Sequence, residues 1–152
     1  MKPALFVIST LGLALLRLRM GQGYPDFLAG WLVVLAFYGE GSRGPVLAAW
    51  IGLLHGYPSH SRMDGILALG LYLLLHSQRF HLGRDGWLPR ALVTSLTCLV
   101  LGLPGAPFLE AAWWQTHARL LSTFGLMTGI LSLPLFPCGR RWGDTLGLRA
   151  GP

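Results

Sequence analysis

Residues Pro45 to Ser77 read PVLAAWIGLLHGYPSHSRMDGILALGLYLLLHS, and this stretch decides how the rest of the chain is interpreted. It holds two apolar runs joined by a short loop of Pro, Ser and His residues. Proline is favoured at the first position of a helix, as at Pro45, and it stops a helix that it follows, as at Pro58. The stretch therefore predicts a helical hairpin inside a membrane.

The composition of the whole chain agrees with lipid as its solvent. Of the 152 residues, 53% are hydrophobic and 12% are charged, whereas about 25% are charged in a soluble domain. The net charge of +6 comes from arginines at the ends of apolar runs, so it indicates topology and contact with anionic lipids rather than with nucleic acid. Cys98 and Cys138 form neither a CxxC pair nor a disulfide framework.

The apolar runs predict an all-α integral membrane protein with about six transmembrane helices in a single domain, residues 1–152. Eight basic residues then fall on one side and four on the other, which places both termini in the cytoplasm. The short apolar cores of the first and fifth helices leave a count of five open. The predicted helices are 3–19, 25–39, 45–57, 65–77, 90–104 and 118–136, with a tail after Pro137.

Small residues recur every four positions in two of these helices. Ala48, Gly52 and Gly56 share one face of the third helix, and Gly125 and Gly129 share one face of the sixth. Such faces let two helix backbones approach closely in a membrane. They predict close packing against another helix, of this chain or of a partner.

Ionisable groups give little sign of chemistry. The acidic residues fall at predicted helix ends, so none is expected to be buried, and Asp26 is expected to cap the second helix. His55, His60 and Asp64 form the one plausible metal set, but their spacing matches no metal motif. Since the sequence also lacks a nucleophile elbow, a P-loop and a dinucleotide fingerprint, we expect no cofactor, no metal and no enzymatic activity.

Three short motifs resemble the rod-shape-determining protein MreD family. They are Tyr24-Pro25-Asp26-Phe27-Leu28, Gly52-Leu53-Leu54 and Asp64-Gly65-Ile66-Leu67-Ala68-Leu69. That family shows a Pro-Asp start to its second helix, a Gly-Leu-x-x-Asp end to its third, and a Gly followed by small and apolar residues at the start of its fourth. One departure is His55, in the segment after Gly52-Leu53 where the family commonly has an acid. The residues that carry the resemblance are Pro25, Asp26, Gly52, Leu53, His55, Asp64 and Gly65.

The resemblance implies a non-catalytic, multi-pass scaffold of the bacterial inner membrane. Such a protein binds the bitopic membrane protein MreC and helps to control cell shape and peripheral peptidoglycan synthesis. Its further partners would be MreB, RodA and the transpeptidase that works with RodA. The family is also similar in architecture to the substrate-binding (S) subunits of energy-coupling-factor (ECF) vitamin transporters.

Two other functions stay open from the sequence. A substrate-binding subunit of an ECF-type vitamin transporter would need a pocket, and Trp50, His55, Tyr57 and His60 are the nearest residues from which to build one. A membrane enzyme acting on lipid-linked substrates would use His60, Arg62 and Asp64 near the outer surface.

Overall fold

The computed structural model describes residues 2–20, 25–39, 43–57, 63–79, 86–102 and 111–146. Within these ranges every regular element is an α-helix, so the predicted all-α fold is confirmed. The first five helices begin and end no more than three residues from their predicted bounds. The elements are α1 (Lys2–Met20), α2 (Phe27–Tyr38), α3 (Arg43–Gly56), α4 (Met63–Gln78), α5 (Trp87–Gly102), α6 (Ala111–Leu131) and α7 (Leu135–Leu146).

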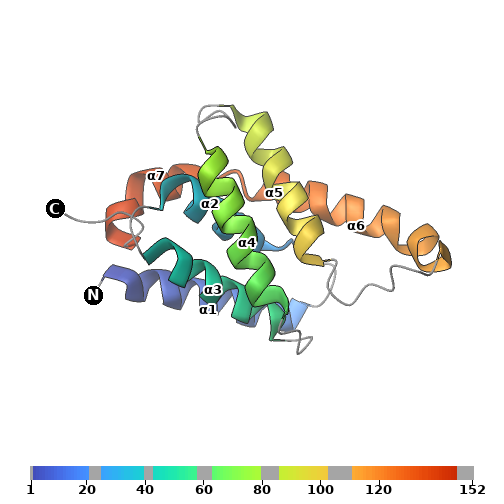
Figure 1. Ribbon diagram of the computed structural model, residues 1–152, viewed down its shortest axis with the longest axis horizontal. Helices are drawn as coiled ribbons and strands as arrows, with labels where there is room; N and C mark the ends of the chain where they lie inside the picture. Colours follow the sequence, from blue (N-terminus) through green and yellow to red (C-terminus); the bar gives the residue numbers. More distant parts are fainter. Residues whose placement is uncertain are drawn as a thin grey trace.

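Helix α2 is the centre of the molecule. Every residue from Leu28 to Phe37 is buried, because α2 is apolar on all sides and contacts each of the other helices. The α3–α4 hairpin packs on one side of α2 and the α5–α6 hairpin on the other, and α6 extends beyond the rest of the bundle (Figure 1). The arrangement brings the start of α2 and the ends of α1 and α3 together.

The end of the chain differs from its prediction. The predicted helix 118–136 begins earlier, at Ala111, and the predicted tail after Pro137 is helical to Leu146. Pro134 has no N–H to donate, so the chain changes to a tighter turn, in which Leu135 N–H donates to Ser132 O at 2.9 Å. Pro137 then falls in the first turn of α7, where the missing N–H costs little, and the helix resumes.

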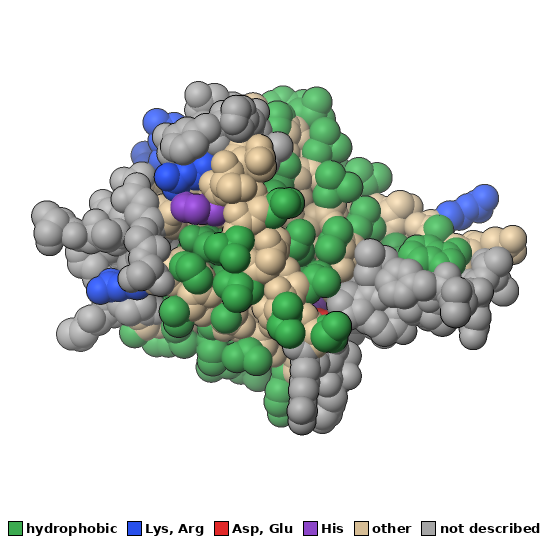
Figure 2. Space-filling model, in the orientation of Figure 1, with side chains coloured by type: hydrophobic (Ala, Val, Ile, Leu, Met, Phe, Trp, Pro, Cys, Tyr) green, Lys and Arg blue, Asp and Glu red, His purple; other side chains and the backbone are tan. Residues whose placement is uncertain are grey.

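Large apolar side chains are exposed on the outer faces of several helices. Ile8 on α1, Ile66 on α4 and Leu96 on α5 are each at least 60% exposed, and green hydrophobic side chains cover much of the face in Figure 2. Among the described residues, length and hydropathy identify one stretch, His117–Arg141, as able to span a membrane, and α2 and α5 are shorter apolar helices. This finding alone is weak support for a membrane protein.

Candidate functional site: a buried cluster of charged residues

Asp26 begins the site at the start of α2. Its Oδ1 accepts hydrogen bonds from the backbone N–H groups of Leu28 at 3.1 Å and Ala29 at 3.3 Å, so the predicted N-cap is confirmed. The side chain of Asp26 is only 2% exposed. The expectation that the acidic residues avoid the interior is therefore wrong for Asp26, because the start of α2 lies among the other helices rather than at a surface.

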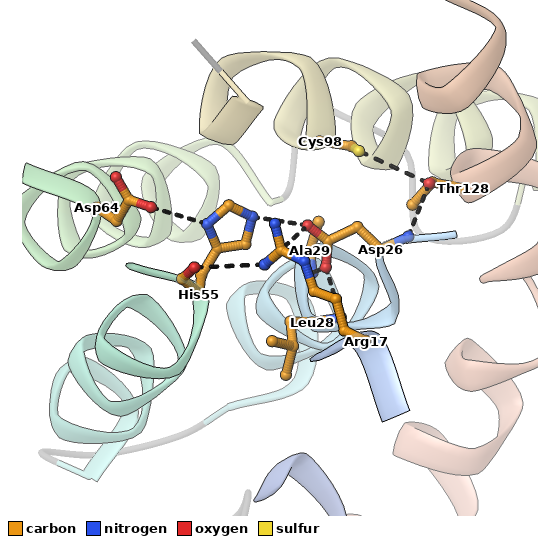
Figure 3. Close-up of polar contacts among 8 residues, drawn as sticks. All are labelled: Arg17, Asp26, Leu28, Ala29, His55, Asp64, Cys98 and Thr128. Atoms are coloured by element: carbon orange, nitrogen blue, oxygen red, sulfur yellow. Dashed lines mark hydrogen bonds and ion pairs between the residues drawn. The ribbon is translucent and has the colours of Figure 1, made fainter. Parts of the chain in front are cut away.

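His55 joins two carboxylates. Its Nε2 lies 2.7 Å from Asp26 Oδ2, and its Nδ1 lies 3.0 Å from Asp64 Oδ2 (Figure 3). His55 is in the last turn of α3 and Asp64 in the first turn of α4. All three side chains are at most 4% exposed, so Asp64 is the second acid whose predicted exposure is wrong. The hairpin turn between α3 and α4 brings both residues to the end of α2.

Arg17, at the end of α1, adds a positive charge beside Asp26. Its Nη1 lies 3.8 Å from Asp26 Oδ2 and donates to the backbone carbonyl of His55 at 3.4 Å. The Arg17 side chain is 27% exposed. We call Arg17, Asp26, His55 and Asp64 the charged cluster. It is drawn in Figure 3.

The contacts fix how many protons the cluster holds. A carboxylate only accepts hydrogen bonds, and a neutral imidazole has one N–H. Because both ring nitrogens of His55 face carboxylate oxygens, the group needs one proton more than a neutral imidazole with two carboxylates. Counting the guanidinium of Arg17, its formal charge is then zero. Burial of an unbalanced charge is costly, so a neutral total is the arrangement that a buried cluster favours.

Helices α5 and α6 reach the cluster through neutral groups. Asp26 N–H donates to Thr128 Oγ1 at 3.0 Å, and the Cys98 thiol donates to the same oxygen at 3.6 Å. The other carboxylate is less well supported, since Asp64 Oδ1 is buried without a hydrogen-bond partner among the residues that the structure describes. His55 is therefore the principal support of the Asp64 carboxylate.

The glycine faces pack within the chain. A Cβ at Gly52 would lie 2.7 Å from Gly65 Cα and 2.8 Å from Ala68 Cβ, so α3 and α4 touch through their backbones there. Ala48 and Gly56 are buried as well. Because α4 covers this face, the face is buried and offers no exposed surface for a partner to bind.

The second glycine face packs on α5 in the same way. A Cβ at Gly125 would lie 3.3 Å from the carbonyl oxygen of Ser95, and one at Gly129 would lie 2.5 Å from that of Ala91. Close approach of α6 to α5 therefore depends on both glycines. This face too is unavailable to a partner.

Of the residues considered for other functions, the described part of the chain brings together His55 and Asp64, which belong to the charged cluster. Trp50 Nε1 donates to Thr10 Oγ1 on α1, at 3.1 Å, and Tyr57 is 71% exposed. His60 and Arg62 lie outside the described residues. In the described part of the chain, no group of three or more His, Cys, Asp or Glu side chains is arranged to hold a metal ion.

Other predicted residues take ordinary positions. Pro25 is buried next to Asp26, Leu53 is 65% exposed, and Gly65 contributes its backbone to the contact with Gly52. Sequence reasoning missed the roles of Arg17 and Thr128. A signal for Arg17 was present, because its predicted place was at the same side of the membrane as Asp26 and Asp64. Thr128 lies within an apolar helix and gave no such signal.

A comparison of the chain with models of protein families, with curated proteins and with solved structures finds no match.

Proposed function

We propose that this chain is a non-catalytic, multi-pass membrane scaffold of the MreD kind, which binds a MreC-like bitopic protein of the bacterial cell-elongation machinery. The observation that carries the proposal is the convergence of the motif residues. Asp26, His55 and Asp64 meet in the charged cluster, and Gly52 contacts Gly65 directly beside it. Residues that are far apart in sequence thus form one structural unit.

The exposed surface supports a membrane location. The outward-facing residues of α1 and α4 include Leu5, Ile8 and Leu15 and Ile66 and Leu73, each more than half exposed. Exposed apolar area of this extent is typical of contact with lipid or with another protein. We propose the bacterial inner membrane as the location, about six spans, and both termini in the cytoplasm.

Both ring nitrogens of His55 already have partners, and this favours a scaffold function over an enzymatic one. Carboxylates engage both of its ring nitrogens, so the imidazole has no free nitrogen with which to activate a nucleophile. The cluster joins helix ends and its ionic contacts are internal. This is the pattern of a group that holds a fold together.

Affinity purification tests the proposal. The tagged full-length chain is extracted from its own membranes in mild detergent, and the proteins recovered with it are identified by mass spectrometry. We expect a single-span, coiled-coil-containing protein together with RodA and its transpeptidase. Recovery of a paired ATPase module in their place would overturn the proposal in favour of a vitamin-transporter subunit.

A matched pair of variants separates loss of fold from loss of a partner. Ile66→Ser changes an exposed position of α4, and Ala68→Ser changes a fully buried position on the same helix. If α4 carries the partner surface, the first variant folds and loses the partner, whereas the second loses the partner only to the extent that it loses folded protein. Retention of the partner by Ile66→Ser would assign binding to another helix.

A further inference from the structure

We propose that the charged cluster binds one exchangeable proton on His55, and that this proton is a latch which holds the start of α4 against the end of α3, beside the start of α2. The inference goes beyond the scaffold function and does not depend on which partner the chain binds.

The helix ends favour placing the proton on His55. Asp26 caps α2 and Asp64 is in the first turn of α4, so both carboxylates lie at the positive ends of helix dipoles. His55 is in the last turn of α3, where the dipole favours a cation. The guanidinium of Arg17 adds a further positive charge beside Asp26. These fields favour negative charge at the two carboxyl groups and positive charge at the imidazole, so we place the proton on His55.

Loss of that proton would break one of the two contacts. A neutral imidazole has one N–H, so one of the two carboxylates would face a ring nitrogen lone pair. The cluster would then carry a net charge of −1 inside the protein. Among the described residues, the charged groups facing His55 are Arg17 from α1, Asp26 from the start of α2 and Asp64 from α4, and those of α5 and α6 that reach the cluster are the neutral Cys98 and Thr128.

The Asp64 contact is the weaker of the two. Asp26 also accepts from two backbone N–H groups and lies beside Arg17, whereas the second oxygen of Asp64 is buried without a partner in the described part of the chain. Release of the proton therefore loosens α4 from α3 more than it loosens α2. Arg17 is the cluster member with the most exposed side chain, so the proton exchanges with solvent on its side.

Nitrogen-15 NMR of histidine-labelled, full-length protein in detergent micelles tests the proton's position. The His55 signals are those that His55→Gln removes; if that variant does not fold, replacement of the other four histidines leaves His55 as the sole labelled imidazole. We expect both His55 ring nitrogens to carry protons at pH 7. A neutral His55 at pH 7 would overturn the proposal.

Asp64→Asn tests the charge balance. The variant removes one negative charge, and the new amide can donate to a ring nitrogen lone pair, so His55 should give up its proton at the pH at which the unmodified protein keeps it. The signals of His76, which contacts the backbone carbonyl of Ala36, should not change. If His55 keeps both protons in Asp64→Asn, charge balance does not set the proton count and the proposal fails.

Hydrogen exchange tests the latch itself. As His55 loses its proton, protection of residues 63–68 at the start of α4 should fall about tenfold or more beyond the intrinsic effect of pH. Residues 92–96 of α5 are the internal control, and in Asp64→Asn the protection of 63–68 should no longer follow the titration. If 63–68 and 92–96 change in parallel while His55 titrates, there is no latch.

Discussion

Gly52→Ala is the sharpest test of the way α3 meets α4. The new Cβ would lie 2.7 Å from Gly65 Cα, 2.8 Å from Ala68 Cβ and 2.8 Å from the carbonyl oxygen of Asp64. Non-bonded carbon atoms are comfortable at about 3.5–4.0 Å, so the two helices would have to separate by about 1 Å. Two of the three atoms belong to the backbone, so a change of side-chain rotamer cannot relieve the contact.

The expected loss of stability follows from that separation. Overpacking costs about 1–3 kcal/mol. The movement also stretches the 3.0 Å contact between His55 and Asp64, and loss of a hydrogen bond to a charged group costs about 1.5–3 kcal/mol. Alanine has the higher helix propensity, which offsets about 1 kcal/mol. We expect the free energy of unfolding to fall by about 1.5–5 kcal/mol in all.

Gly70→Ala is the matched control, since it makes the same chemical change on the partner helix. A Cβ at Gly70 would meet no atom within 4 Å, so this variant should be at least as stable as the unmodified protein. The measurement is reversible unfolding in mixed detergent micelles, followed by fluorescence of the six tryptophans. Equal stabilities of Gly52→Ala and Gly70→Ala would refute the backbone contact between α3 and α4.

Three further substitutions test single contacts. His55→Asp puts a third carboxylate beside two buried ones and should abolish recovery of monodisperse protein on size exclusion; normal recovery would contradict the cluster. Thr128→Val leaves a buried backbone N–H at the start of α2 without its acceptor and should lower the free energy of unfolding by about 1–3 kcal/mol, whereas Thr123→Val, at an exposed position of α6, should change it by less than about 0.5 kcal/mol. Trp50→Phe removes the N–H that donates to Thr10 and should cost about 1 kcal/mol or more in the same assay; no change would show that the bond adds nothing.

Local signals predicted the helices well and the end of the chain poorly. Pro45 and the Asp26 cap act on their own neighbours, so they mark helix starts that do not depend on the rest of the fold. Pro134 and Pro137 were interpreted by the same rule as the end of the last helix. The rule fails there because Pro137 falls in a first turn, which tolerates proline, and the following residues continue as α7.

The charged cluster was harder to predict, because its contacts join distant parts of the chain. Asp26 and Thr128 are 102 positions apart, and nothing local in either segment indicates the other. Topology gave part of the answer, since the ends of the first and third helices and the starts of the second and fourth fall on one side of the predicted membrane. It placed Arg17, Asp26 and Asp64 together but not inside the protein. The burial of Asp64 follows from how closely α3 and α4 pack through Gly52 and Gly65, and that of Asp26 from the position of α2 among the other helices.

The charge balance of the cluster explains why a histidine suits position 55. An acid at position 55 would lie between two buried carboxylates with Arg17 as the one cation of the cluster. Histidine reverses the sign of the charge and makes the total zero. A change of charge at position 55 would therefore need a compensating change of charge at the end of α1 or at the starts of α2 and α4. His55 is best understood as one member of a balanced set of buried charges.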